Sequence, residues 1–192
     1  MSESIHIISR IIWTLLLLYW VLSGIKNKQT KSQQSVFERV VLYWFPIIVS
    51  LYLLGPEKWF EHTLLRGRFL PHHNSIGIIG LLFVVTGMVI ACWARYLLGK
   101  NWSFSVQKKK DHELITKGVY KIVRHPIYTG LLLMFVGHTI IVGEYRGLIA
   151  VLIIFISFYF KLRKEETWLI ELFGDKYLKY QNKTKAIIPF LL

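Results

Sequence analysis

One stretch decides how this chain folds: Gly118-Val-Tyr-Lys-Ile-Val-Arg-His-Pro-Ile-Tyr-Thr-Gly130. Its first half is basic and aromatic, and its second half begins an apolar run. Pro126 suits the first position of a helix, because the N–H that proline lacks would be unpaired there. We therefore predict that a helix starts at Pro126 and enters a membrane. The start of a helix has unpaired donors and a partial positive charge, so this is a good place for polar chemistry beside a bilayer.

Apolar residues and positive charge are segregated along the chain. Hydrophobic residues make up 54% of the 192 residues, and the formal net charge is +13. The length fits a single domain. Five apolar runs approach or reach the roughly 20 residues that a membrane-spanning helix needs. We therefore predict an all-α, polytopic membrane protein with five transmembrane helices, at residues 5–25, 40–56, 76–99, 126–142 and 147–162.

The lysines and arginines predict the topology. Four lie in residues 26–39, seven in residues 100–124 and seven in residues 161–185, out of 24 in the chain. With five spans these three segments lie on one side of the membrane, and the excess of positive charge makes that side cytoplasmic. The N-terminus is then outside and the C-terminus is cytoplasmic. Because the charges flank membrane spans, we exclude nucleic acid as a partner.

The segments between the spans carry further structural predictions. Residues 57–75 mix aromatic and charged side chains, a pattern typical of an interfacial helix on the outer side. The short connection 143–146 predicts a tight helical hairpin, which places His125 beside the residues that follow the last span. Residues 165–181 have helical periodicity interrupted by Gly174. The apolar residues 186–192 are expected to pack back onto the membrane or the core.

Two polar groups meet at this hairpin, and each has two interpretations. His125 either caps the helix that Pro126 opens or takes part in a site. Glu165 and Glu166 either form a solvated helical turn, with Glu165 paired to Lys161 four residues earlier, or hold an amine close to the bilayer.

The aromatic residues and the single cysteine allow further predictions. Tyr120 and Tyr128 either anchor the chain at the interface or form a cation–π wall for a cationic ligand. Cys92 is the only cysteine and lies in an apolar run, so we predict no intramolecular disulfide. His112 and His125 have no spacing typical of a zinc site and no cysteine joins them, so we predict no metal.

Two neighbouring segments resemble a known family: His112-Glu-Leu-Ile-Thr-Lys-Gly-Val-Tyr120 and Arg124-His-Pro-Ile-Tyr-Thr-Gly130. They are similar to motifs of the integral membrane methyltransferases in the isoprenylcysteine carboxyl methyltransferase and phospholipid methyltransferase group. The resemblance implies one methyltransferase domain over residues 1–192, in which residues 1–94 hold the first three spans and residues 95–192 hold the motifs. Further motifs that extend it are Gly99-Lys-Asn-Trp-Ser103, Glu165-Glu166, Phe173-Gly-Asp-Lys-Tyr-Leu-Lys-Tyr180 and Pro189-Phe190.

The resemblance implies S-adenosylmethionine as the methyl donor and S-adenosylhomocysteine as the product. It also implies a basic residue just before the acidic pair that contacts the methyl acceptor. We assign this role to Arg163, with Lys161 as the competing candidate, and we include Glu166 in the catalytic group. The cofactor contacts that the resemblance implies are Gln107, His112, Glu113, Leu114, Ile115, Tyr120, His125, Pro126, Ile127, Tyr128 and Glu165.

The resemblance further implies that the acceptor is the C-terminal carboxylate of an isoprenylcysteine or a similar lipid-like carboxylate. This substrate enters sideways from the bilayer and reacts on the cytoplasmic side. A carboxylate has a pKa of about 3–4 and is ionised at neutral pH, so it needs no general base, whereas an amine often needs one. Three alternatives stay open: a phospholipid or small-amine N-methyltransferase, a membrane reductase of the sterol type that uses NADPH, and a non-catalytic membrane scaffold.

Overall fold

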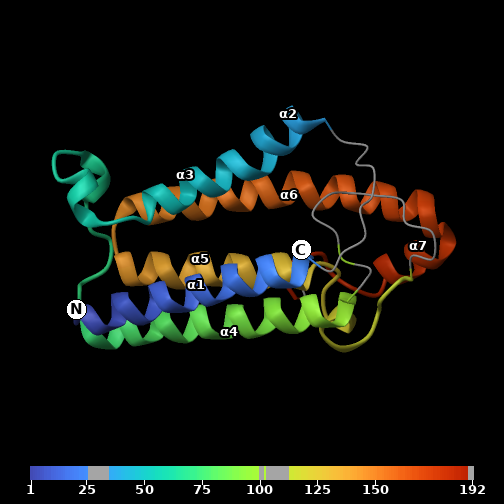
Figure 1. Cartoon of the computed structure of the whole chain (residues 1–192), viewed down its shortest axis with the longest axis horizontal. Helices are drawn as coiled ribbons and strands as arrows, with labels where there is room; N and C mark the ends of the chain where they lie inside the picture. The colour runs from blue at the N-terminus through green and yellow to red at the C-terminus, as the bar shows by residue number, and fades with distance from the viewer. Residues whose placement is uncertain (26–34, 100–101, 103–112, 190–192) are drawn as a thin grey trace.

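The protein is a bundle of long helices (Figure 1). The computed structural model describes residues 1–25, 35–99, 102 and 113–189. In that part of the chain every regular element is helical, which confirms the predicted all-α class. The α-helices are α1 (Glu3–Ile25), α2 (Val36–Arg39), α3 (Phe45–Leu53), α4 (Asn74–Leu98), α5 (Pro126–Val142), α6 (Tyr145–Phe173) and α7 (Asp175–Gln181). A π-helical segment, η1 (Val40–Trp44), joins α2 to α3, and the 3₁₀ turns are η2 (Glu57–Phe60), η3 (Leu64–Arg66) and η5 (Gly118–Lys121).

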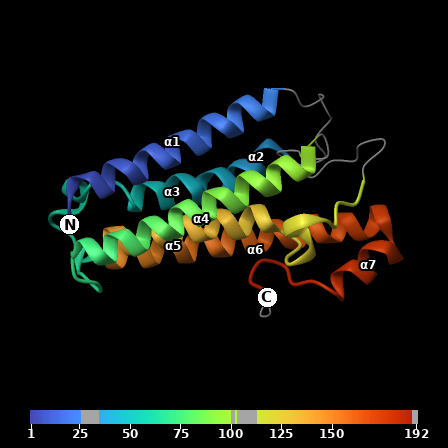
Figure 2. The same cartoon turned by 90° about the horizontal axis from the view of Figure 1, so that it is seen from below.

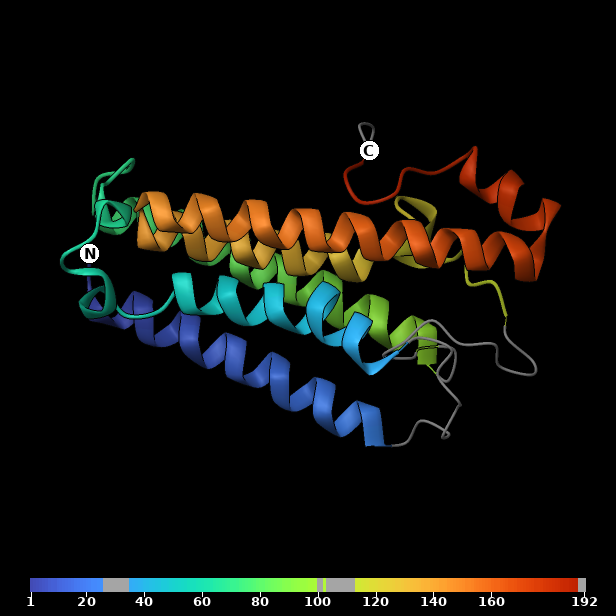
Figure 3. The ribbon, with the colours of Figure 1, turned by 90° about the horizontal axis from the view of Figure 1, so that it is seen from above.

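The long helices contact one another in the order α1, α4, α5, α6 and α3. Figure 2 shows α4, α5 and α6 next to one another. The second apolar run, from α2 through α3, lies along α6, while α1 lies against α4. Seen from above, α1 stands apart from α2 and α3 (Figure 3). One end of the bundle carries Met1 and the α5–α6 hairpin, and the other end carries η5, the start of α5, and α7.

Close packing between α4 and α5 depends on glycines. A Cβ atom on Gly87 would lie 2.4 Å from the carbonyl oxygen of Gly130, and one on Gly137 would lie 2.6 Å from that of Gly80. Any larger residue at these positions would push the two helices apart, as at other small-residue helix contacts in membranes. This contact fixes α5, and with it the Pro126 end, beside α4.

The α5–α6 hairpin is as tight as predicted. Helix α5 begins at Pro126 and ends at Val142, and α6 begins at Tyr145. Gly143 has a φ of 67°, a left-handed conformation that glycine adopts without strain. The hairpin therefore brings the start of α5 alongside the second half of α6.

Three helices, α1, α4 and α6, are long and apolar enough to cross a membrane. The two other predicted spans are also apolar helices, but the α5 helix has 17 residues and the one at Val40–Leu53 is likewise short. Many large apolar side chains on the outside of the bundle are exposed. An integral membrane protein accounts for these features.

The structure corrects one prediction and refines others. The predicted interfacial helix over residues 57–75 is wrong, since only the single turns η2 and η3 form before α4 begins at Asn74. Gly67 and Pro71 prevent a longer helix there. Helix α6 continues unbroken to Phe173, and Gly174, with a φ of 53°, separates it from α7 as predicted. In the tail, Ala186 and Ile187 are buried in the core, which confirms the packing predicted for this part.

Candidate active site

A cavity of about 570 Å³, called here the main cavity, lies where α5 begins. Side chains from α1, η1, α3, α4, η5, α5, α6 and α7 line it, and its volume is in the range of small-molecule binding sites. Most of the residues predicted for the cofactor lie in its walls. They are Glu113, Leu114, Ile115, Tyr120, His125, Ile127, Tyr128 and Glu165, together with Lys161 from the predicted catalytic group.

Backbone contacts with the tail position the start of α5. The N–H of Arg124 donates to the carbonyl of Lys185 at 2.8 Å, and the N–H of His125 donates to that of Ala186 at 2.9 Å. His125 occupies the N-cap position of α5, but its side chain makes no capping hydrogen bond. The capping interpretation of His125 is therefore wrong, and its imidazole is directed to other partners.

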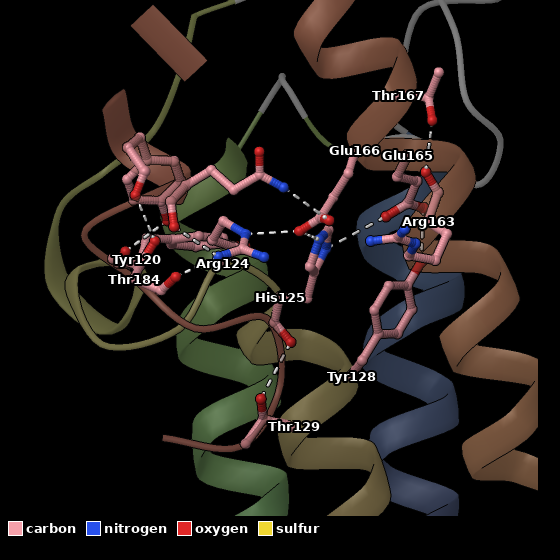
Figure 4. A network of polar contacts seen from close by, with 12 residues as sticks. Tyr120, Arg124, His125, Tyr128, Thr129, Arg163, Glu165, Glu166, Thr167 and Thr184 are labelled. Carbon is pink, nitrogen blue, oxygen red and sulfur yellow. Dashed lines mark hydrogen bonds and ion pairs between the residues drawn. The ribbon is translucent and has the colours of Figure 1, made fainter. Parts of the chain in front are cut away.

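Those partners are the two adjacent glutamates of α6 (Figure 4). The imidazole Nε2 of His125 lies 3.3 Å from Oε1 of Glu166, and its Nδ1 lies 3.6 Å from Oε2 of Glu165. The hydroxyl of Tyr128 donates to Oε1 of Glu165 at 2.6 Å. The acidic pair is therefore no solvated turn, because His125 and Tyr128 hold both carboxylates in place.

Glu166 holds neighbouring residues of the site in position. Its Oε1 accepts a hydrogen bond from Nε of Arg124 at 2.6 Å, and its Oε2 accepts one from the side chain of Gln181 at 3.3 Å. Arg124 also donates to the carbonyls of Gln181 and Thr184. Glu166 is buried and does not line the main cavity, so it is placed to orient His125 and to anchor the tail.

The two candidate cations of α6 face different cavities. Lys161 and Glu165, four residues apart, line the main cavity. Arg163 and Glu166, three residues apart, line a second cavity of about 280 Å³. Side chains three or four residues apart share one face of a helix, which explains this division. Of the two predicted candidates, the one in the main cavity is Lys161, although Arg163 was preferred from the sequence.

Lys161 lies between aromatic rings. Its Nζ is 4.7 Å from the ring centre of Tyr43 and 5.4 Å from that of Tyr128. Both separations fit a cation–π interaction. Among the described residues no carboxylate oxygen is placed within 4.0 Å of this ammonium group, which leaves its N–H donors available to a ligand.

Three tyrosines, Tyr120, Tyr177 and Tyr180, also line the main cavity. Tyr120 donates a hydrogen bond to the Ala94 carbonyl at 3.4 Å, and its own carbonyl accepts one from Tyr180 at 2.6 Å. The hydroxyl of Tyr177 is buried and, within the described residues, has no hydrogen-bond partner. Burial raises the pKa of Tyr120 and of Tyr177, so both hydroxyls stay protonated.

The side of the main cavity formed by α1 and η1 is open. Leu17 and Val21 of α1 and Trp44 of η1 line the cavity and are nevertheless 56%, 62% and 52% exposed. The neighbouring Trp13 packs edge-on against Phe135 at 5.0 Å, and both rings line the cavity. This side of the main cavity is therefore both apolar and accessible from outside the bundle.

Some predicted residues lie elsewhere, and some lining residues were not predicted. Gln107 and His112 lie outside the described residues. Pro126 is buried at the start of α5 without lining the main cavity, so it contributes by starting the helix. Tyr43 and Trp13 come from spans without a motif, and only the three-dimensional packing reveals them. Tyr177 lies within the motif of residues 173–180, so the family resemblance could have identified it as a lining residue.

Comparison with known proteins adds the family context. A family model described as phospholipid methyltransferase matches residues 76–176, which include η5, α5 and α6. The chain is 28% identical over 188 residues to a protein-S-isoprenylcysteine O-methyltransferase of Schizosaccharomyces pombe, covering 92% of this chain and 79% of the relative. It is 32% identical over 141 residues to the protein of the same name in Homo sapiens, covering 70% of this chain and 49% of the relative.

A solved structure shares the fold. The eukaryotic intramembrane Ras methyltransferase ICMT (isoprenylcysteine carboxyl methyltransferase) matches with a TM-score of 0.60 and 26% sequence identity. The match covers 91% of this chain and 61% of that protein. The chain therefore spans about half to four fifths of the proteins it resembles.

Proposed function

We propose that this chain, which belongs to the phospholipid methyltransferase family, methylates the C-terminal carboxylate of an isoprenylcysteine or a similar lipid-like carboxylate. Similarity to proteins named protein-S-isoprenylcysteine O-methyltransferase supports this assignment. The observation that carries it is the placement of Lys161, a cation held between two aromatic rings in a largely apolar cavity that also contains Glu165.

The main cavity fits S-adenosylmethionine as the methyl donor. This cofactor carries an α-ammonium group and supplies an electrophilic methyl group on a sulfonium centre. Glu165 offers a carboxylate whose Oε1 is fixed by Tyr128, and Oε2 is directed toward His125. The hydroxyl of Tyr177, which has no hydrogen-bond partner among the described residues, is a buried donor in the same cavity. We assign Glu165 to the α-ammonium group and Tyr177 to a polar group of the donor, and His125 holds the Glu165 side chain in position.

Lys161 is assigned to the acceptor. An ionised carboxylate needs no proton removed before it attacks, so the protein has to align it, hold it and exclude water. A charge-assisted bond from the Lys161 ammonium group does the holding. The rings of Tyr43 and Tyr128 limit where that group can move. Because Lys161 and Glu165 lie one helical turn apart, the acceptor and donor groups would be held side by side.

The open side between α1 and η1 supplies the path for the apolar part of the acceptor. Its lining side chains are apolar and exposed, as described for Leu17, Val21 and Trp44. In a bilayer these side chains contact lipid tails, so a prenyl chain enters there without crossing water.

The membrane arrangement follows from the charges. We assign all five apolar helices to membrane spans, with the N-terminus outside and the C-terminus cytoplasmic, because three basic segments then share the cytoplasmic side. The main cavity lies at that end of the bundle, so methyl transfer takes place on the cytoplasmic side. Helix α5 and the run Val40–Leu53 are short for a span. Packing against neighbouring helices and aromatic side chains that reach the membrane interface accommodate such short spans.

An amine acceptor, as in a phospholipid N-methyltransferase, is the second candidate. The description of the matching family model and the presence of His125 in the main cavity favour it, since an imidazole can accept the proton that an amine loses.

A labelling experiment separates the two. Purified protein in detergent or nanodiscs is given donor with a labelled methyl group and, separately, a prenylcysteine, phosphatidylethanolamine or a fatty acid. We expect label on the prenylcysteine that is released by mild alkali, because a methyl ester hydrolyses and an N-methyl group does not. Alkali-stable label on phosphatidylethanolamine would overturn the carboxylate assignment. Titration with S-adenosylhomocysteine and with NADPH tests the donor, and binding of NADPH alone would contradict the methyltransferase proposal.

A further inference from the structure

Positively charged side chains outnumber negatively charged ones in the second cavity. Arg124, Arg163 and Lys185 line it, together with the carboxylate of Glu166 and the polar side chain of Thr184. Glu166 is already paired with Arg124 at 2.6 Å. In the part of the chain that the structure describes, no carboxylate oxygen lies within 4.0 Å of the charged groups of Arg163 or Lys185. Two cations therefore remain for a ligand, which has to be an anion.

The second cavity is separate from the main cavity. Arg124 lines both, but Glu166 and Arg163 line only the second, and Glu165 and Lys161 line only the main one. A ligand here is consequently neither methyl donor nor acceptor in the proposed reaction.

An apolar stripe on α6 leads to this cavity. Leu148, Leu152, Ile156 and Tyr159 are all exposed, and they follow one another at intervals of four, four and three residues. Arg163 comes four residues after Tyr159 on the same face, and Tyr159 itself lines the second cavity. A lipid acyl chain lying along this stripe would bring its head group to Arg163.

We propose that the second cavity binds the phosphate of an anionic phospholipid, with Arg163 and Lys185 contacting the phosphate and the α6 stripe contacting an acyl chain. The arginine fork matches the geometry of phosphate oxygens, and a basic recess at the cytoplasmic interface suits anionic lipids. Lys185 belongs to the C-terminal tail. The carbonyl of the preceding residue, Thr184, accepts a hydrogen bond from Arg124. The bound lipid therefore ties the tail to α6, beside the residues that hold His125.

The proposal is tested by binding, independently of methyl transfer. Delipidated protein in a neutral detergent is titrated with phosphatidylglycerol or phosphatidylcholine carrying the same acyl chains, and retention is measured by native mass spectrometry. We expect preferential retention of phosphatidylglycerol. Arg163→Gln and Lys185→Gln should each weaken it about fivefold, the effect of one surface cation on anionic lipid binding. Lys176→Gln, which removes one positive charge from an exposed position of α7, is the matched control and should leave binding unchanged.

Four results would overturn the proposal. Equal retention of the two lipids would show that the phosphate charge is not recognised. An equal loss in Lys176→Gln would show a general charge effect instead of a site. Displacement of phosphatidylglycerol by inorganic phosphate at the same concentration would show that the apolar stripe contributes nothing, and that the ligand is a free phosphate. Retained phosphatidylglycerol in both pocket variants would equally exclude Arg163 and Lys185.

Discussion

Two buried arginine–glutamate pairs lie at opposite ends of the bundle. At the α5–α6 hairpin, Nε of Arg146 lies 2.5 Å from Oε2 of Glu144. Beside the main cavity, Nε of Arg124 lies 2.6 Å from Oε1 of Glu166. The two pairs have the same chemistry and nearly the same geometry, but their surroundings differ.

The hairpin pair is enclosed by protein. Arg146 donates to the carbonyls of Leu53 at 2.7 Å and Gly55 at 2.6 Å, and its guanidinium group lies 4.7 Å from the ring centre of Phe60. The side chains of Arg146 and Glu144 are 1% and 0% exposed. This pair joins the end of α3 to the hairpin and lines neither the main cavity nor the second one, so we assign it a structural role.

The pair beside the main cavity is connected to the cavity through His125 and Glu165. Glu166 contacts His125, and His125 contacts Glu165, which lines the cavity. An ion pair is therefore not by itself evidence of a site. The functional role comes from the imidazole and the second carboxylate that connect the pair to open space.

The largest expected effect lies at the hairpin. Arg146→Met leaves Glu144 charged and buried, and should lower the free energy of unfolding by about 3–5 kcal/mol. The double variant Glu144→Leu/Arg146→Met removes both charges and should recover part of this loss. Thermal unfolding in detergent measures both. A loss of S-adenosylhomocysteine affinity with normal stability would contradict the structural role assigned to the hairpin pair.

The second prediction concerns the cation of the main cavity. Lys161→Met should lower kcat/KM for a prenylcysteine at least about thirtyfold, corresponding to 2 kcal/mol or more for the loss of one partner of a buried charge pair. Arg163→Met is the matched comparison on the other face of α6, and it should lower kcat/KM by less than about fivefold. Both are measured at saturating donor. A severe defect in Arg163→Met with a mild one in Lys161→Met would restore the assignment preferred from the sequence.

Local chemistry made much of the fold predictable. Pro126 started α5, Gly143 allowed the tight hairpin and Gly174 ended α6, because proline and glycine constrain the backbone at their own positions. The family resemblance, now confirmed by a match over residues 76–176, named cofactor residues most of which line the main cavity.

Packing decided what the sequence left open. The sequence offers both Lys161 and Arg163 just before the acidic pair, and only the rotation of α6 against its neighbours assigns them to different cavities. Tyr43 and the lining residues of α1 reach the main cavity through tertiary contacts, for which their apolar sequences gave no signal. Residues 57–75 have an amphipathic composition, but turn-forming residues within them outweighed it.

The third prediction tests the donor carboxylate. Glu165→Gln should weaken S-adenosylhomocysteine binding by about one to two decades, because a hydrogen bond to a charged group contributes about 1.5–3 kcal/mol. Glu171→Gln changes the same residue type at an exposed position of the same helix and should leave binding unchanged. Calorimetric titration of the two variants gives the comparison, and unchanged affinity in folded Glu165→Gln would refute the role of this carboxylate.

The smallest effect is expected from two tyrosines of α7. The Tyr180 hydroxyl donates to the Tyr120 carbonyl at 2.6 Å, whereas the Tyr177 hydroxyl has no partner within the described residues. Tyr180→Phe should therefore lower the melting temperature, because it removes a bond inside the protein. Tyr177→Phe should leave the apo protein equally stable and weaken S-adenosylhomocysteine about two- to tenfold, the worth of one neutral hydrogen bond. Since burial raises the pKa of Tyr177, its hydroxyl stays a donor from about pH 6 to about pH 9, and the loss should be constant over that range. Unchanged affinity in Tyr177→Phe would mean that the donor does not use this hydroxyl, and a drop in apo stability would mean that the group is bonded within the protein.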